Sequence, residues 1–185
     1  RAAIADALGQ VTTLSYELAA DIYKITKITD PFGRFATLEY DVSGRLAKIT
    51  DVLGLASEFK YDGASDFIQA LVTPYGTTTF TKSDVGINRS LEILYPDGNR
   101  ERAEFNQDTT LGIPNSEAAH KVPTGVSARN EFLWYRNTYY WSRIACALAY
   151  GDYTKAKVYH WLHTPDLNSA ASTLESVKEP LENRV

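Results

Sequence analysis

Polar and apolar side chains alternate along residues 35–40, where Ala36, Leu38 and Tyr40 fall on one face and Phe35, Thr37 and Glu39 on the other. A second alternation follows over residues 45–50. A period of two is typical of a half-buried strand. Because a short break separates the two runs, we predict two antiparallel strands joined by a turn.

The breaks between these runs have the composition of tight turns. Asp30-Pro31-Phe32-Gly33 precedes the first strand, and Asp41-Val42-Ser43-Gly44 separates it from the second. Aspartate can accept hydrogen bonds from the backbone two residues on, proline fixes φ, and glycine tolerates a positive φ. The segment therefore predicts a β-hairpin.

The same pattern of turns and strands recurs along the first 107 residues. It is clearest between residues 30 and 62, where the repeat-defining residues are Asp30, Gly33, Tyr40, Asp41, Gly44, Asp51, Gly54, Tyr61 and Asp62. The turn glycines recur about every 22 residues, a period typical of stacked repeats; they are Gly9, Gly33, Gly54, Gly76 and Gly98. Residues 1–107 thus predict five repeats, of which the first has a return strand over residues 22–28.

The rest of the chain predicts more strands and one long interruption. Residues 108–130 lose the alternation and contain Pro114 and Pro123, which predicts an irregular loop or insertion. Residues 131–185 predict further strands of the same sheet, with a loop over 165–173 and a strand pair after it. The pattern over 138–150 is ambiguous and also fits a short helix that Gly151 would end. The predicted fold is mainly β: antiparallel hairpin repeats in an extended, curved sheet.

The motif around the second turn resembles a known repeat family. Gly33-Arg34 followed by Tyr40-Asp41-Val42-Ser43-Gly44-Arg45-Leu46 is similar to the YD repeat of bacterial Rhs proteins. The resemblance implies a β-sheet strip that spirals into a hollow shell around a C-terminal polypeptide, often a toxin. It also implies a secreted or bacterial cell-envelope location, and the remainder of the parent chain and the enclosed cargo as partners.

Charge and composition exclude some classes of partner. The net charge of −4, with no basic patch, argues against nucleic-acid binding. No apolar run is long enough to cross a membrane. The chain begins at Arg1 and contains no methionine, so we expect a fragment of a longer protein. Five repeats are too few to close a shell, so the fragment is expected to expose sheet edges and to self-associate.

Candidate chemistry is sparse, and we predict no enzyme, no catalytic residue, no cofactor and no metal. His160 and His163 with Glu175 and Glu179 could be drawn as a metal site, but strand residues three apart point to opposite faces. The recurring aspartates could suggest calcium, but their positions are explained by the turns. Cys146 lies in an apolar run and is expected to be buried.

Two classes of function remain from the sequence. In the first, the chain is wall material of a shell that encloses and helps to deliver a toxin-like C-terminal polypeptide. In the second, exposed aromatic rings form a carbohydrate- or protein-binding surface of an adhesin-like protein; the candidate residues are Tyr75, Trp134 and Trp161. The direction in which these rings point distinguishes the two classes.

Overall fold

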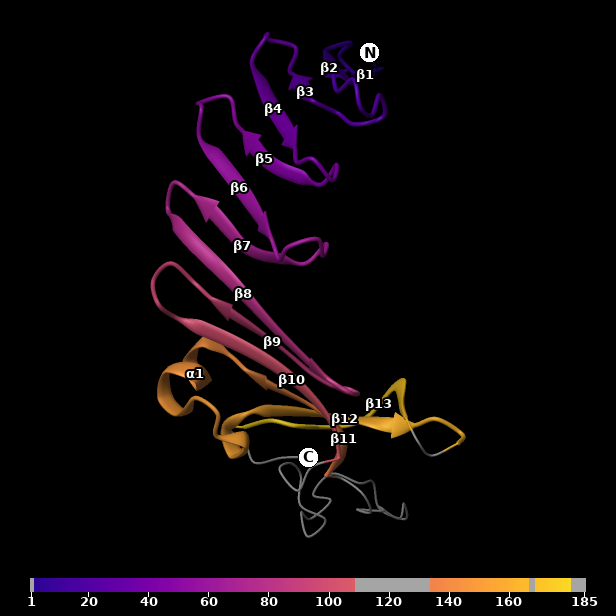
Figure 1. Cartoon of the computed structure of the whole chain (residues 1–185), viewed down its shortest axis with the longest axis vertical. Coiled ribbons are helices and arrows are strands. Elements are labelled where there is room, and N and C mark those ends of the chain that lie inside the picture. Colours follow the sequence, from indigo (N-terminus) through magenta and orange to yellow (C-terminus); the bar gives the residue numbers. More distant parts are fainter. Residues whose placement is uncertain (1, 109–133, 167–168, 181–185) are drawn as a thin grey trace. The chain divides into compact units, whose positions relative to one another are not determined.

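A computed structural model describes residues 2–108, 134–166 and 169–180 of the chain. It contains 13 strands that form one antiparallel sheet, in which every strand pairs with its neighbours in sequence (Figure 1). The described residues also include one short α-helix. The prediction of a mainly β, antiparallel fold is therefore confirmed.

The chain divides into two compact units, residues 1–79 and 80–185. The first unit ends within β8, and the strands before β8 have six residues or fewer. The strands are β1 (Ala2–Ala5), β2 (Val11–Ser15), β3 (Lys27–Thr29), β4 (Phe35–Tyr40), β5 (Leu46–Thr50), β6 (Ala56–Tyr61), β7 (Ile68–Thr73) and β8 (Gly76–Val85).

The second unit combines strands with the helical segment. Its elements after β8 are β9 (Asn88–Leu94), β10 (Arg100–Asp108), β11 (Tyr135–Trp141), α1 (Arg143–Ala149), the 3-10 turn η1 (Tyr153–Lys155), β12 (Lys157–His163) and β13 (Ala170–Lys178). The predicted loop over 108–130 lies almost wholly outside the described residues, because only Asp108, the last residue of β10, is described.

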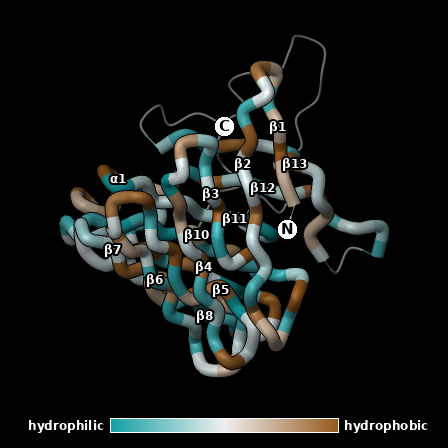
Figure 2. Tube along the Cα trace, turned by 90° about the horizontal axis from the view of Figure 1, so that it is seen from above, coloured by the Kyte–Doolittle hydropathy of each residue, from teal (hydrophilic) through white to brown (hydrophobic). Residues whose placement is uncertain are grey.

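The strand register gives the sheet of the first unit two unlike faces. Leu38 pairs with Ile49 on one face, and Phe59 pairs with Leu71 further along it. The opposite face carries charged pairs, such as Glu39 with Lys48. This alternation follows from the period of two, and Figure 2 shows it as changes of hydropathy along the strands.

The apolar face of the first unit is not packed into a core. Leu38, Ile49, Phe59 and Leu71 are all only half-buried, and Ser15 is the single buried residue among residues 2–79. No helix or second sheet belongs to this unit in the part that the structure describes. A folded domain normally buries such a face against another layer, so this surface is available to a partner.

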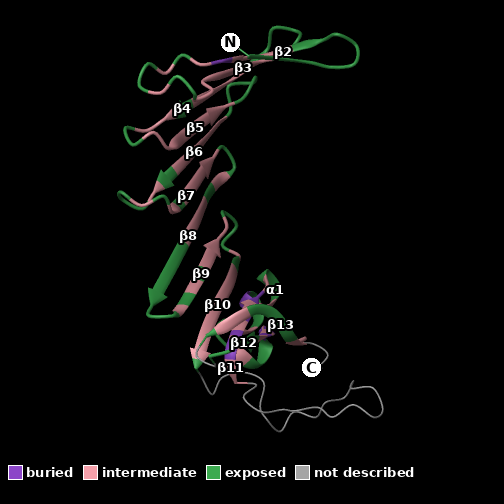
Figure 3. Ribbon diagram, turned by 90° about the vertical axis from the view of Figure 1, so that its right-hand side faces the viewer, coloured by how far each residue is buried: buried purple, intermediate pink, exposed green. Residues whose placement is uncertain are grey.

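The buried core lies in the second unit, where the helical segment covers one face of the sheet. Tyr139, Trp141, Cys146, Ala156 and Val158 form it, and they are 8% exposed or less. Figure 3 shows the buried residues gathered around β11, β12 and α1. Tyr153 packs edge-on against the rings of Tyr139 and Trp141, with centroids 4.9 and 5.1 Å apart, a favourable geometry for aromatic pairs.

Two expectations about element boundaries were wrong, whereas the short helix expected within 138–150 is present. The return strand predicted over 22–28 is only β3, because the Asp21 carboxylate accepts a hydrogen bond from the Tyr23 amide and holds the preceding residues in a turn. The helix begins at Arg143, since β11 continues to Trp141 and Ser142 caps the helix. In the predicted loop over 165–173, β13 already begins at Ala170.

Candidate functional site

The repeat turns share one hydrogen-bond pattern. The Asp41 carboxylate accepts hydrogen bonds from the amides of Ser43 and Arg45, both at 2.9 Å. Asp30 and Asp51 accept from the amides two and four residues on in the same way, at 2.8–2.9 Å. The fourth residue of each turn is a glycine with φ near +80°, such as Gly33 at +83°, a conformation that other residues adopt only with strain.

The carboxylates of Asp41 and Asp30 are stabilised in their charged form. The Arg45 amide, followed by the Arg45 guanidinium at 2.8 Å, lowers the pKa of Asp41 below its ordinary value despite some burial. For Asp30, burial raises the pKa, but hydrogen bonds from Arg34 outweigh it and the net shift is downward. Each aspartate therefore acts as an ionised acceptor that organises its turn.

The repeat tyrosines connect neighbouring strands through their hydroxyl groups. Tyr40 Oη donates to the Ile25 carbonyl and Tyr61 Oη to the Leu46 carbonyl, both at 2.8 Å. A register shift immediately precedes each tyrosine in its pairing with the next strand. The two tyrosines thus occupy equivalent positions, one repeat apart.

A basic side chain lies over the ring of each of these two tyrosines. Lys24 Nζ lies 5.2 Å from the centre of the Tyr40 ring and donates to the Gly44 carbonyl in the following turn. Arg45 Cζ lies 4.3 Å from the centre of the Tyr61 ring, and Nη1 donates to the Gly63 carbonyl at 3.2 Å.

We call each set of contacts a repeat clamp. The first clamp comprises Lys24, Tyr40 and the Gly44 carbonyl, and the second comprises Arg45, Tyr61 and the Gly63 carbonyl. In each, one cation covers a tyrosine ring and bonds the turn of the next repeat. Carbonyls and a stacked ring are the groups that stabilise such a cation. The clamps couple successive hairpins.

Sequence reasoning named the aspartates, glycines and tyrosines of this site but missed the role of the cations. Lys24 and Arg45 each precede a repeat tyrosine by the same interval along the sequence. That interval was the available signal. The alternation placed Lys24 and Arg45 in predicted return strands, over residues 22–28 and 45–50, where a basic side chain usually faces water.

Other predicted turn positions have different geometry. Asp62 begins a longer turn, in which its amide donates to the Phe67 carbonyl at 2.9 Å. Thr73 and Gly76 flank a two-residue hairpin loop, and the Thr73 hydroxyl accepts from the Tyr75 amide at 3.2 Å. The Gly98 amide donates to the Tyr95 carbonyl as in the regular turns, although a tyrosine replaces the aspartate.

The candidate ligand-facing aromatics occupy separate environments. Tyr75 is 83% exposed in the loop between β7 and β8 of the first unit. In the second unit, the Trp134 ring lies 3.6 Å from the Tyr135 ring, between centroids. Trp161 Nε1 donates to Thr138 Oγ1 at 2.9 Å, and its side chain lines an open cleft.

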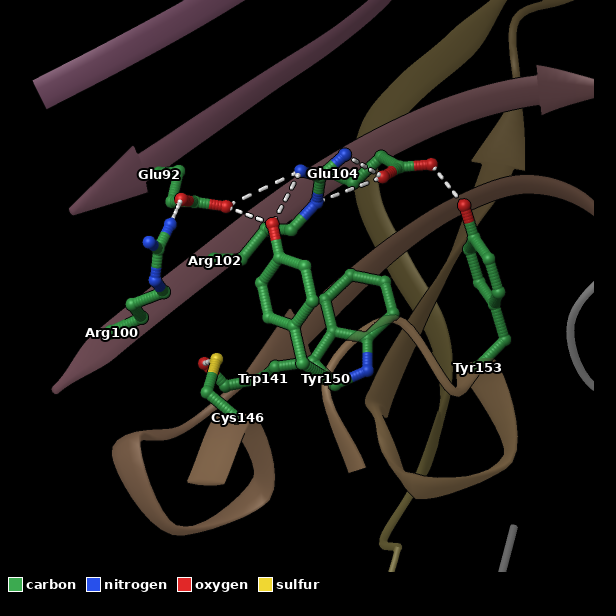
Figure 4. A network of polar contacts seen from close by, with 8 residues as sticks. All are labelled: Glu92, Arg100, Arg102, Glu104, Trp141, Cys146, Tyr150 and Tyr153. Carbon is green, nitrogen blue, oxygen red and sulfur yellow. Dashed lines mark hydrogen bonds and ion pairs between the residues drawn. The ribbon is translucent and has the colours of Figure 1, made fainter. Parts of the chain in front are cut away.

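A network of polar contacts fastens the helical segment to β9 and β10 of the second unit (Figure 4). Arg102 pairs with Glu104 at 2.7 Å and with Glu92 at 3.5 Å. Tyr153 Oη donates to Glu104 at 2.6 Å, and Tyr150 Oη donates to Glu92. Two carboxylates on the sheet thus anchor two tyrosines from the segment that covers the core.

The contacts of this network shift the pKa values of its carboxylates and phenols. Burial raises the pKa of Glu104, but hydrogen bonds from Tyr153 and Arg102 outweigh it, so the pKa is lower than usual. Burial, with the Glu104 contact, raises the pKa of Tyr153 to about 12. The carboxylates are therefore ionised and the phenols neutral near pH 7. Since each oxygen is engaged, the network is suited to holding the segment.

His160, His163 and Cys146 lie in separate surroundings in the part of the chain that the structure describes. His160 is fully buried, with Nδ1 2.9 Å from Asn137 Oδ1 and Nε2 3.0 Å from Glu175, whereas exposed His163 contacts the Thr164 carbonyl. Across the described ranges, no three potential ligands converge on one point. Burial raises the pKa of the Cys146 thiol, which lowers its reactivity.

Membrane crossing by a helix receives no support from the described residues, since none of their helices combines sufficient length with an apolar composition.

Comparison with protein families identifies the repeat. The model of the RHS Repeat family matches residues 24–56. This range begins at Lys24, includes Tyr40, Gly44 and Arg45, and ends in β6, so it contains the first clamp and the cation of the second. The recognition of an RHS repeat from the Tyr-Asp motif is therefore confirmed over these residues. No curated protein matches the chain.

Proposed function

We propose that this chain is a wall segment of an RHS shell that encloses a C-terminal, toxin-like polypeptide and helps to deliver it from a large bacterial secreted or surface protein. The observation that carries this proposal is the half-exposed apolar face of the first unit. An enclosed polypeptide would cover that face, while the charged face would remain in water.

The energetics of the apolar face favour a partner. Leu38, Ile49, Phe59 and Leu71 each keep part of their side chain accessible, and completing the burial of such a side chain contributes up to about 1.5–3 kcal/mol. An incompletely folded polypeptide offers apolar side chains of many sizes. A continuous apolar sheet face can hold such a chain through non-directional contacts, without a pocket shaped for one particular side chain.

The repeat clamps support the same role because they stiffen the sheet. A single layer of strands has no second layer to maintain its curvature or register. The two clamps bond each turn to the turn of the next repeat through Lys24 and Arg45. A wall that excludes the cell's proteases requires this kind of coupling between repeats, so that strands do not separate locally.

Limited proteolysis of the full-length parent protein, followed by mass mapping, tests the proposal. We expect the C-terminal polypeptide to survive while the repeats are intact, and to be digested when the Arg45→Ala and Lys24→Ala substitutions loosen the clamps. Arg34→Ala, at an exposed arginine of the same turn type, is the matched control. Free digestion of the C-terminal polypeptide beside intact wild-type repeats would show that enclosure is wrong.

A second candidate function is recognition of a glycan or protein by exposed aromatic side chains. The observation that favours it is the cleft at Trp161, a predicted ligand-facing residue. Binding of a glycan array or of surface proteins by the wild-type chain, compared with Trp161→Phe and Tyr75→Ala variants, tests this function independently of enclosure. Equal signals from all three chains would contradict it.

A further inference from the structure

An open cleft of about 400 Å³ lies on the sheet of the second unit. Five consecutive strands, β9 to β13, contribute to this one concavity. The lining residues are Arg89, Phe105, Thr138, Trp161 and residues 170–172. Arg89 pairs with Phe105, and Phe105 with Thr138, which places the three side chains in one row across the sheet. The volume is within the range of small-molecule sites, which begins at about 300 Å³.

The backbone around Trp161 is irregular in a way that places its ring in the cleft. The register of β12 against β13 shifts on both sides of Trp161, and such bulges redirect side chains near functional sites. Arg136, the one non-glycine residue with positive φ in the described ranges, at +53°, donates from Nε to the Trp161 carbonyl at 3.1 Å. The Trp161 indole is held by Thr138 Oγ1 at 2.9 Å.

The floor and walls of the cleft are mainly apolar. Ala170 and Ala171 line it together with the rings of Trp161 and Phe105. Among the residues that the structure describes, no lining side chain is a carboxylate or a carboxamide. Aromatic rings beside small side chains favour an apolar or aromatic ligand group.

Arg89 supplies a positive charge at one end of this row. Its guanidinium carbon lies 6.0 Å from the centre of the Phe105 ring. Within the described residues no carboxylate forms an ion pair with it, whereas Arg100 and Arg102 on the next strand both pair with Glu92. A guanidinium beside an apolar surface is well suited to bind a carboxylate through two parallel hydrogen bonds.

We propose that this cleft binds a ligand that joins an apolar, preferably aromatic, group to a carboxylate. The proposal rests on the recognition function above and names its ligand class. The aromatic group lies between Trp161 and Phe105, and the carboxylate bonds Arg89. A free aromatic acid and the C-terminal residue of a peptide share this chemistry.

Calorimetric titration with 3-phenylpropionate, its neutral amide, an acetylated dipeptide ending in phenylalanine and, as a sugar probe, cellobiose tests the proposal. We expect a Kd of about 1 mM for an acid of this size, and at least tenfold weaker binding of the amide. Arg89→Gln is expected to weaken binding of the acid by about tenfold or more, because a charge-assisted hydrogen bond is lost. Arg34→Gln is the control, since Arg34 also stacks on a ring, that of Phe32 at 5.5 Å, and is not among the residues that line the cleft.

The outcomes separate this inference from the recognition function. Binding of the free acid, or of the peptide acid alone, supports the inference and identifies the source of the carboxylate. Equal affinity for acid and amide, or an unchanged affinity in Arg89→Gln, would overturn it. Binding of cellobiose without binding of either acid would overturn the ligand class but leave recognition in place. If no probe binds, this inference fails, and the array measurement described above decides recognition separately.

Discussion

The guanidinium of Arg45 lies 4.3 Å from the centre of the Tyr61 ring and reaches from one repeat turn to the carbonyl of Gly63 in the next. Lys24 and Tyr40 repeat this relationship one unit earlier. The contact explains how consecutive hairpins of a single-layer sheet keep a fixed spacing without a second layer. Stability should therefore depend on a few side chains at the turns.

Replacing Arg45 with alanine should lower the free energy of unfolding by about 2–3 kcal/mol, because charged hydrogen bonds and a cation–π contact are lost. Arg34→Ala should cost less than about 1 kcal/mol, since the Arg34 side chain is 64% exposed against 17% for Arg45. Urea unfolding measures both. Equal losses of unfolding free energy in the two variants would show that the contact of Arg45 with the next repeat adds no stability.

Replacing Tyr61 or Tyr40 with phenylalanine should destabilise the protein by about 1 kcal/mol each, because a carbonyl loses its hydroxyl donor. The control is Tyr75→Phe, as the Tyr75 side chain is 83% exposed in a loop. Thermal unfolding followed by circular dichroism provides the comparison. The idea of equivalent clamps fails if only one of the two repeat tyrosines is sensitive.

Gly33 and Gly44 have nearly the same φ, +83° and +78°, but different surroundings. Gly33→Ala should cost about 1–2 kcal/mol from backbone strain alone, because no atom lies within 4 Å of an added Cβ. Gly44→Ala should cost more, since its Cβ would displace Lys24 Nζ.

A double-mutant cycle tests the cause of that difference. In a Lys24→Ala background the extra cost of Gly44→Ala should disappear, because the displaced side chain is gone. If the two substitutions have additive effects on the free energy of unfolding, displacement of Lys24 does not cause the difference between Gly44→Ala and Gly33→Ala.

Stability should fall as the pH is lowered below about 4. The pKa values of Asp41, Asp30 and Glu104 are lower in the folded state than their ordinary values. Such groups stabilise the fold above their unfolded pKa, and this contribution is lost as the pH falls through the folded pKa. Urea midpoints between pH 7 and pH 2 measure the effect, and Asp41→Asn should flatten part of it. A pH-independent midpoint would contradict the ionised turns.

The sequence was sufficient to predict the strands and turns of residues 30–62 because their signals are local. The Asp41 carboxylate bonds amides two and four residues away, and the alternation over residues 35–40 directly determines the faces of β4. The contacts of Lys24 with Gly44 and of Arg45 with Gly63 were not predicted, because they join residues from different repeats. The same reason applies to the cleft, where Arg89 and Trp161 meet only after four strands have paired.

Photo-crosslinking from the two faces of β6 tests the enclosure of a polypeptide most directly. A photoreactive amino acid replaces Phe59, on the apolar face, or the adjacent Lys60, on the charged face, in the full-length protein. We predict crosslinks from position 59 to the C-terminal polypeptide and none from position 60. Crosslinks from neither position, or equally from both, would contradict the account of the first unit as part of a wall whose apolar face holds a cargo.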